Sequence, residues 1–372
     1  MIKVMSVFGT RPEAVKMCPL IKHFEKISEI DSVVCLTGQH KEMLWQVIDI
    51  FGISVQYNLD IMQERQTLTT ITVSILEKLE KVLAVEKPDI VLVHGDTSTS
   101  FAAALAAFYQ QIPVGHVEAG LRTYDRYSPF PEEMNRCLTG RIATLHFAPT
   151  VDNKRNLLLE GIRENVHVTG NTVIDAFSTT IKEDYEYKSD DLRDIDFEGK
   201  RCILMTAHRR ENLGENLTNI CRAVKRIVSE FEDVLVVYPV HRNPAVSETA
   251  KRILGSVDRV YLTEPLDVED MHNLMARSYM VMTDSGGLQE EAPACGLPVL
   301  VLRTETERPE AARAGTVKVV GVSEKGIYEN ARLLLTDANI YKRMAQAVNP
   351  YGDGRASERI ADIILQYGRN AI

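Results

Sequence analysis

Short apolar runs alternate with amphipathic segments along most of the chain. The apolar runs have the length and composition of strands, and they lie near residues 2–8, 32–37, 89–94, 113–118, 143–148, 166–168, 202–206, 234–238, 260–263, 279–283 and 298–302. Helical patterns such as 13–27 and 98–110 separate them. Strands that alternate with helices are typical of βαβ units, so the pattern predicts an α/β fold with parallel sheets.

The length of 372 residues favours two domains over a single core. Residues 172–199 are charged and carry no strand pattern, and we interpret them as a helix and connector that open the second domain. We predict a Rossmann-like domain over 1–170, a second one over 171–355, and a last helix within 356–372 that packs back on the first. Two such doubly wound domains would face one another across a cleft, with ligands at the carboxyl ends of their strands.

Composition and charge narrow the choice of partners. The formal net charge is -9, which argues against a general nucleic-acid or anionic-membrane binder. The most apolar stretch, 101–108, is far shorter than the ~20 residues that span a bilayer, and no signal-peptide pattern follows Met1. The six cysteines form no CxxC pair, which favours reduced thiols in a cytoplasmic protein.

A glycine pair marks a candidate phosphate site in the second half. Gly286 and Gly287 follow an apolar run and open a helical pattern, where free backbone N–H groups and the helix dipole attract anions. Glu290 and Glu291 lie one turn further on, where a carboxylate can accept hydrogen bonds from sugar hydroxyls. Arg308 follows the next strand and adds a positive charge. The alternative is an ordinary tight turn with two solvated glutamates.

Cations follow the first predicted strand. Arg11 and Lys16 lie in the segment GTRPEAVK, at the start of a predicted helix. Arginine binds phosphate through two prongs and lysine as a point charge. The segment is neither GxGxxG nor a Walker loop, so it signals neither NAD nor ATP. The alternative is a capped helix with two solvated cations.

Three carboxylates follow later strands of the first half. Asp96 lies in HGDTS, Glu118 in GHVEAG and Glu132 in PFPEE. If they converge, each would shift the pKa values of the others, which is how one site obtains both an acid and a base. The alternatives are structural: Asp96 caps a helix, Glu118 pairs with Arg122, and Glu132 favours a helix N-terminus.

Basic turns follow two strands of the second half. His208 stands beside Arg209 in AHRREN, at the start of a helical pattern, and suits a diphosphate. His241 occupies a similar strand-then-basic-turn position in YPVHRNP. A lone histidine is more often structural, but its place at a helix start beside arginines favours a functional role here.

These motifs together resemble the non-hydrolysing UDP-N-acetylglucosamine 2-epimerase family. The matching segments span the chain in order: GTRPEAVKMCPL, TGQHKEML, VLVHGDTSTS, PVGHVEAGLRT, SPFPEEMNR, VTGNTVIDA, AHRREN, YPVHRNP, TDSGGLQEEAP, TERPEA, AGTVKVVG and NPYGDG. The resemblance implies a GT-B fold and interconversion of UDP-N-acetylglucosamine (UDP-GlcNAc) and UDP-N-acetylmannosamine (UDP-ManNAc), with no redox cofactor and no metal. The family route eliminates UDP to give 2-acetamidoglucal and then adds UDP back.

The resemblance also implies roles for individual residues and leaves open which carboxylate is the base. The catalytic positions are Asp96, Glu118, Glu132 and His208. The positions that hold UDP and the sugar are Arg11, Lys16, Met271, Ser285, Gly286, Gly287, Glu291 and Arg308. A second UDP-GlcNAc, bound as an activator, would use Gln39, Glu42, Arg65, Arg209 and His241. Homodimers are common in the family, so we expect one here.

Four alternatives stay open at this point. A hydrolysing 2-epimerase would release free ManNAc, but its relatives show Ala-Asp where this chain has Pro12-Glu13. A GT-B glycosyltransferase shares the fold and the nucleotide site. A non-catalytic UDP-sugar sensor is disfavoured because the acidic residues are retained. A metal-dependent hydrolase would draw on potential ligands at His94, Asp96, His116 and Glu118, without an HxH or HExxH motif.

Overall fold

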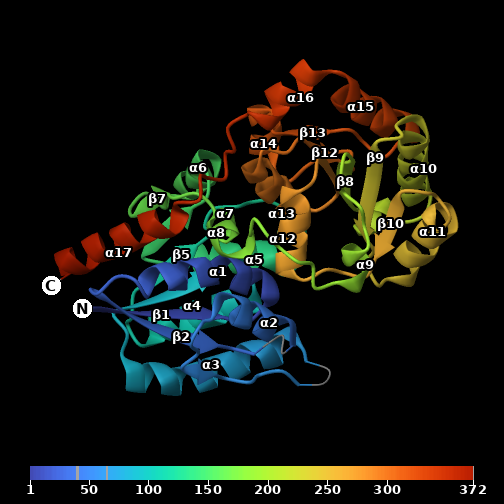
Figure 1. The fold of residues 1–372 in the computed structure, drawn as a ribbon. Coiled ribbons are helices and arrows are strands. Elements are labelled where there is room, and N and C mark those ends of the chain that lie inside the picture. The colour runs from blue at the N-terminus through green and yellow to red at the C-terminus, as the bar shows by residue number, and fades with distance from the viewer. Residues whose placement is uncertain (39–41, 64–65, 372) are drawn as a thin grey trace. The chain divides into compact units, whose positions relative to one another are not determined.

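The computed structural model describes residues 1–38, 42–63 and 66–371. The chain divides into two compact units, and each is built on one parallel sheet (Figure 1). Unit 1 comprises Met1–Thr179 and Tyr351–Ile372, and unit 2 comprises Thr180–Pro350. No helix in the described ranges is long and apolar enough to cross a membrane.

Unit 1 carries a seven-stranded sheet in the order β3-β2-β1-β4-β5-β6-β7. Its strands are β1 (Ile2–Phe8), β2 (Ile30–Leu36), β3 (Tyr57–Asn58), β4 (Ile90–His94), β5 (Val114–Val117), β6 (Leu145–Ala148) and β7 (Val166–Val168). Its helices are α1 (Arg11–Phe24), α2 (Glu42–Phe51), α3 (Leu68–Glu86), α4 (Ser98–Tyr109), α5 (Glu132–Ile142), α6 (Val151–Leu159), α7 (Thr172–Asp175), α8 (Phe177–Thr180) and α17 (Ala356–Ala371). The strand order reverses between β1 and β4, which is where doubly wound sheets bind ligands.

Unit 2 carries a six-stranded sheet in the order β10-β9-β8-β11-β12-β13. Its strands are β8 (Arg201–Thr206), β9 (Val234–Pro239), β10 (Val260–Thr263), β11 (Met280–Thr283), β12 (Val299–Val301) and β13 (Val317–Val319). Its helices are α9 (Asp190–Arg193), η1 (Arg210–Asn212), α10 (Glu215–Glu230), α11 (Pro244–Leu254), α12 (Val268–Ala276), α13 (Gly286–Glu291), η2 (Ala292–Cys295), α14 (Pro309–Ala314), α15 (Glu324–Thr336) and α16 (Ala338–Ala345). Its order reverses between β8 and β11.

The predicted α/β class with two Rossmann-like parallel-sheet domains is confirmed. Strand β4 shows why the apolar runs were informative, because all five of its residues are buried and it pairs with a neighbour on each side. Two short strands, β3 and β13, were not predicted. Neither presents a run of buried residues, so neither leaves an apolar pattern in the sequence.

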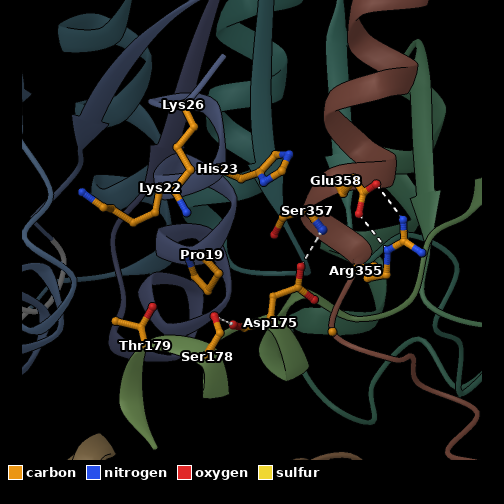
Figure 2. A pocket seen from close by; sticks show the side chains of 11 residues that line it. Pro19, Lys22, His23, Lys26, Asp175, Ser178, Thr179, Arg355, Ser357 and Glu358 are labelled. Atoms are coloured by element: carbon orange, nitrogen blue, oxygen red, sulfur yellow. Dashed lines mark hydrogen bonds and ion pairs between the residues drawn. The ribbon is translucent and has the colours of Figure 1, made fainter. Parts of the chain in front are cut away.

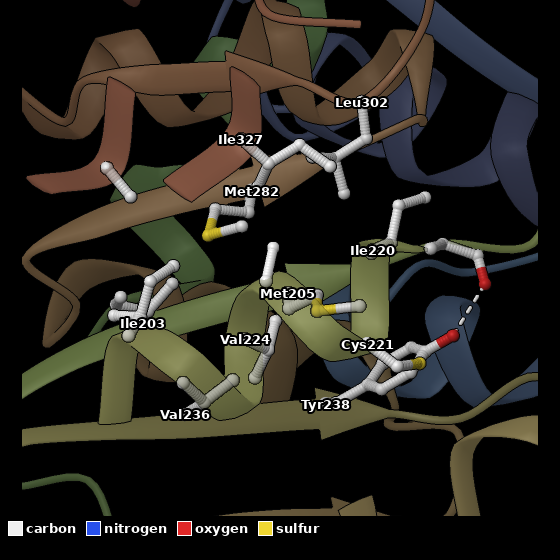
Figure 3. Close-up of a cluster of buried hydrophobic side chains, with 14 of the residues drawn as sticks. Ile203, Met205, Ile220, Cys221, Val224, Val236, Tyr238, Met282, Leu302 and Ile327 are labelled. Carbon is white, nitrogen blue, oxygen red and sulfur yellow. Dashed lines mark hydrogen bonds between the residues drawn. The ribbon is translucent and has the colours of Figure 1, made fainter. Parts of the chain in front are cut away.

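The core of unit 2 fixes the end of β8 and Ala207, which directly precede His208. Apolar side chains from β8, β9 and β11 pack together, among them Met205, Val236 and Met282 (Figure 3). Tyr238 is fully buried among them, and its hydroxyl donates to the carbonyl of Ala207 at 2.6 Å. A buried hydroxyl needs such a partner, and this one fixes the backbone at the end of β8.

The last helix, α17, is held in unit 1 by a carboxylate. Asp175 is buried, and its oxygens accept the backbone N–H groups of Ala356 at 3.2 Å and Ser357 at 2.7 Å. Figure 2 shows the second of these hydrogen bonds. Burial raises the pKa of Asp175, and these hydrogen bonds oppose that rise. A cavity of about 150 Å³ lies beside this contact, between α1 and the start of α17, with Lys22 and Lys26 in its wall.

Candidate active site

Glu13 ties together the two turns at the reversal point of the first sheet. One oxygen of this buried carboxylate accepts the N–H groups of Gly9 at 3.0 Å and Thr10 at 2.8 Å. The other accepts the hydroxyls of Thr97 at 2.6 Å and Ser100 at 3.1 Å. Burial raises the pKa of Glu13, and these donors oppose the rise. In the sequence, Glu13 served only to distinguish the non-hydrolysing from the hydrolysing branch of the family. The structure shows that Glu13 joins the turn after β1 to the turn after β4.

Glu118 lies at the centre of a buried charged cluster just after β5. Its carboxylate is ion-paired with Lys16, accepts from Asn171 Nδ2 at 3.1 Å and from Arg136 at 3.4 Å, and lies 3.6 Å from His94 Nε2. Burial alone would raise the pKa of Glu118, but the charges of Lys16 and Arg136, joined by that of His94 once it is protonated, outweigh it and hold the pKa well below its usual value. Glu118 is therefore a carboxylate at neutral pH.

Arg136 joins Glu118 to Asp96. Its guanidinium is ion-paired with Asp96, and it also donates to the carbonyl of Glu118 at 2.6 Å. The side chain of Asp96 is 27% exposed, so this carboxylate remains within reach of a ligand. Asp96 is not the helix cap, because the hydroxyl of Thr97 caps α4 by accepting from Ser100 N at 3.0 Å. The predicted convergence of Asp96 and Glu118 thus has a physical cause in one shared arginine.

The suggested pairing of Glu118 with Arg122 is wrong. Arg122 instead donates to both oxygens of Glu160, at 2.6 and 2.9 Å. The sequence did not reveal this partner because Arg122 and Glu160 lie far apart along the chain. Arg122 follows β5, whereas Glu160 follows α6. Glu118 therefore forms no structural ion pair with Arg122, the arginine nearest to it in the sequence.

The two glutamates that open α5 have different surroundings. Glu133 is buried and accepts the backbone N–H groups of Thr123 and Tyr124, each at 3.0 Å, so it anchors the preceding loop. Glu132 is the first residue of the helix and only half-buried. Of the two, Glu132 is the one whose carboxylate is available to a substrate.

Lowering the pH is expected to destabilise unit 1 through two buried histidines. Burial lowers the pKa of His94 and of His146 to about 4 in each case. Both side chains are neutral in the folded protein, so the free energy of unfolding is highest above pH ~6.5. It falls between pH ~6.5 and ~4, because the unfolded chain takes up protons there and the folded protein does not. Each histidine should lower the free energy of unfolding by up to about 3 kcal/mol over that range.

The measurement is the melting temperature of the wild-type protein and of His146→Gln at pH 7 and pH 4.5. Carboxylates respond to pH in both proteins, so the difference between them isolates His146. The variant should lose less on acidification than the wild type. Equal losses would show that His146 does not contribute.

Asp284 organises the candidate diphosphate site of unit 2. It is fully buried after β11, and its Oδ2 accepts from His208 N at 2.7 Å, Arg209 N at 2.8 Å and Asn212 Nδ2 at 2.9 Å. The sequence analysis named no role for Asp284. Its signal was an acidic residue directly after a buried strand, where an unpaired charge would be costly.

The imidazoles of His208 and His241 stack in parallel. Their ring centroids are 5.4 Å apart, with an interplanar angle of 8°. The side chain of His208 is 38% exposed, and its Nδ1 lies 3.5 Å from Asp284 Oδ1. Partial burial lowers the pKa of His208, Asp284 raises it, and His241 and Arg209 lower it further; the net direction is downward.

The glycine pair begins α13 as predicted, and Ser285 is its N-cap. A side chain at Gly286 would lie 3.5 Å from the Arg308 guanidinium, so the absence of one leaves space between the helix start and this cation. Arg308 is ion-paired with the buried Glu290. Glu290, considered for sugar hydroxyls, therefore holds Arg308 in place.

The other predicted residues of unit 2 lie on α12 and α13. Glu291 Oε2 is 3.4 Å from His272 Nε2, and His272 Nδ1 is hydrogen-bonded to Thr180 Oγ1 at 2.7 Å. These contacts orient Glu291 without burying it completely. Met271 is half-buried on the same helix as His272.

The residues expected to bind an activator are only partly visible. Arg209 and His241 both lie beside His208. Gln39 and Arg65 lie outside the described residues, and Glu42 opens α2. Across residues 1–38, 42–63 and 66–371, no group of three or more His, Cys, Asp or Glu is arranged to hold a metal ion.

Comparison with known proteins places these features in a family. The model of the UDP-N-acetylglucosamine 2-epimerase family matches residues 22–365. The UDP-N-acetylglucosamine 2-epimerase of Bacillus subtilis is 57% identical over 369 residues, which cover 99% of this chain and 96% of that protein.

Two solved structures show the same similarity. The UDP-GlcNAc 2-epimerase of Neisseria meningitidis, bound to UDP-GlcNAc, is 49% identical with a TM-score of 0.87, covering 98% of this chain and 100% of that one. That of Methanocaldococcus jannaschii, in complex with UDP-GlcNAc and UDP, is 35% identical with a TM-score of 0.77, again covering 98% and 100%. With a family match over most of its length and relatives of this identity, the chain belongs to the UDP-N-acetylglucosamine 2-epimerase family.

Proposed function

We propose that this protein interconverts UDP-GlcNAc and UDP-ManNAc by eliminating UDP to 2-acetamidoglucal and then adding UDP back to C1 and a proton to the opposite face of C2. The observation that supports this most directly is the ionised, buried Glu118, held between Lys16 and Arg136 and joined to Asp96 through the same arginine. Two carboxylates in a fixed relation are what a proton transfer at one carbon requires.

In the elimination, the C1–O bond breaks and its electrons leave with UDP. The C2 proton passes to a carboxylate, and the electrons of the C2–H bond form the C1=C2 double bond. In the reverse step, an acid on the other face returns a proton to C2 while UDP adds to C1. Asp96, Glu118 and Glu132 are the groups to which we assign these transfers, since all three lie in unit 1 close to strand or helix ends.

Departure of UDP needs stabilisation of a growing negative charge. We assign this role to cations and donors that follow strands of the two units: Arg11, Lys16, His208, Arg308 and the helix start at Ser285, Gly286 and Gly287. Glu291 would hold the ribose and Met271 would lie near the uracil. Binding of a second UDP-GlcNAc as an activator through Arg209 and His241, a homodimer and a cytoplasmic location complete the proposal.

The experiment is to incubate the protein with UDP-GlcNAc in deuterated water and to follow the proton spectrum. We expect UDP-ManNAc to appear, with deuterium at C2 of both nucleotide sugars and without accumulation of free sugar. The reason is that the proton removed from C2 exchanges with solvent from the carboxylate that holds it while the glucal intermediate is present.

Other outcomes would redirect the proposal. Free ManNAc with UDP would place the protein in the hydrolysing branch. Epimerisation without deuterium at C2 would contradict the elimination route. No change, even with additional UDP-GlcNAc as activator, would favour a glycosyltransferase or a sensor. Glu118→Gln serves as the control for background exchange.

A further inference from the structure

One oxygen of a fully buried carboxylate has no hydrogen-bond partner among the described residues. Asp284 is 0% exposed, and its Oδ2 takes all three of the donors described above, from His208 N, Arg209 N and Asn212 Nδ2. Its Oδ1 is buried and takes none. An unsatisfied buried carboxylate oxygen is costly, so its persistence calls for a role. The group that faces it is His208 Nδ1, at 3.5 Å.

The ring stacked on His208 accepts a hydrogen bond through one of its nitrogens. His241 Nδ1 accepts the backbone N–H of Asn243 at 3.1 Å, so that nitrogen carries no proton of its own. Positive charges on both rings would repel each other across a stack with ring centroids 5.4 Å apart. The carboxylate of Asp284 lies against His208 and favours the charged form of that ring.

We propose that Asp284 is a positioning residue that keeps a proton on His208 Nδ1 and stabilises the imidazolium, so that Nε2 exchanges a proton with the departing diphosphate. The proposal rests on the proposed epimerase function, in which UDP must leave and return. Its logic is that of a carboxylate that orients a catalytic imidazole without itself becoming protonated. At a separation of 3.5 Å in the free protein, the contact can shorten when the ring becomes charged.

The proton and electron balance is simple. As the C1–O bond breaks, its electron pair moves to the phosphate oxygen, and the proton on His208 Nε2 passes to that oxygen. His208 is then neutral, with its remaining proton on Nδ1 toward Asp284. When UDP returns to C1, the same proton moves back to Nε2. No oxidant, reductant or metal takes part in this exchange.

The groups around His208 set the direction of its pH response. Burial lowers its pKa, Asp284 raises it, and His241 and Arg209 lower it. Asp284 is therefore the group that opposes the other three, and its charge keeps the imidazolium accessible. Removing that charge should lower the pKa further. Because elimination needs protonated His208, the alkaline fall in kcat should then move to lower pH.

The test is Asp284→Asn, which keeps the shape and removes the charge. The amide oxygen must take over the three donors at Oδ2, so the amide NH₂ must face His208 Nδ1. A donor facing Nδ1 forces the proton of the neutral ring onto Nε2. We expect kcat to fall roughly 10²-fold or more, with a smaller change in KM. The nitrogen chemical shifts of His208 in ¹⁵N-histidine-labelled protein should report the exchange of tautomers.

Asn212→Ala is the matched control. It removes one donor from Asp284 Oδ2 and leaves Oδ1 and the charge facing His208. We expect a lower melting temperature, because Asn212 also donates to Leu302 O at 3.0 Å, but an unchanged His208 tautomer and an unchanged pH profile. A purely structural Asp284 would make the two variants behave alike.

Two results would overturn the inference. One is an Asp284→Asn protein that folds, keeps the wild-type His208 tautomer and keeps the wild-type pH profile. The other is wild-type His208 that carries its neutral proton on Nε2. The tautomer measurement needs no substrate, so it remains decisive even if the wild-type protein forms no UDP-ManNAc. In that case the proposed epimerase function fails, whereas a proton on His208 Nδ1 would still support the positioning role of Asp284.

Discussion

Replacing Glu118 with glutamine is expected to lower the rate of UDP-ManNAc formation by roughly 10³-fold. The amide cannot take part in the proton transfers at C2 that we propose for Asp96, Glu118 and Glu132, and the replacement removes the negative charge that Lys16 and Arg136 surround. Exchange of deuterium into C2 should fall by the same factor, because the same proton transfer limits both. The measurements are initial rates of product formation and of C2 exchange in deuterated water.

Loss of activity must be separated from loss of structure. Removing one partner of a buried ion pair can cost about 3–5 kcal/mol, and Glu118→Gln takes one carboxylate away from Lys16 and from Arg136, which keeps its ion pair with Asp96. Glu160→Gln is the matched control, since it breaks the ion pair of Arg122, whose side chain is 0% exposed. That variant should lose stability and keep most of its activity. Equal activity losses in the two variants would contradict a catalytic role for Glu118.

Replacing Gly120 with alanine is expected to destabilise unit 1 by about 4 kcal/mol, as a sum of overpacking and left-handed backbone strain. Gly120 has φ +89°, and a Cβ there would lie 2.2 Å from the carbonyl oxygen of Asn153 and 2.8 Å from its carbon. Backbone atoms at those positions cannot move aside as a flexible side chain can. The change is measured as the shift in the urea midpoint of unfolding.

Gly161 supplies the control for backbone strain alone. Its φ is +82°, close to that of Gly120, but a Cβ there would meet no atom within 4 Å. Gly161→Ala should therefore cost only about 1 kcal/mol, the penalty of the left-handed conformation. Similar losses for the two alanine variants would mean that the contact with Asn153 relaxes and that strain dominates.

The sequence predicted the fold because the central strands are buried on both faces. An apolar run such as β4 leaves a clear pattern, and its alternation with helices implies parallel sheets. The meeting of Asp96 and Glu118 was predicted from the same rule, since both follow neighbouring strands. Short strands at or near a sheet edge, such as β13, leave no comparable pattern.

The partners of the carboxylates were not predictable in the same way. Arg136 and Asn171 contact Glu118 from 18 and 53 residues away in the sequence. Their approach depends on how α5 and the loop before α7 return to the sheet, and periodicity carries no information about that. The role of Asp284 could not be predicted either, because it depends on donors more than 70 residues away in the sequence. Charge pairing is a tertiary property, whereas strand burial is visible locally.

The division of unit 1 into two segments of chain has a consequence for the order of folding during synthesis. Residues 180–350 form unit 2 and leave the ribosome before α17 exists. Until then Asp175 lacks the backbone donors of Ala356 and Ser357, and a carboxylate without partners resists burial. Domains usually complete their folding from the N-terminus onward. Here all residues of the second unit are synthesised before α17, so the first unit can complete its folding only when the end of the chain has been made.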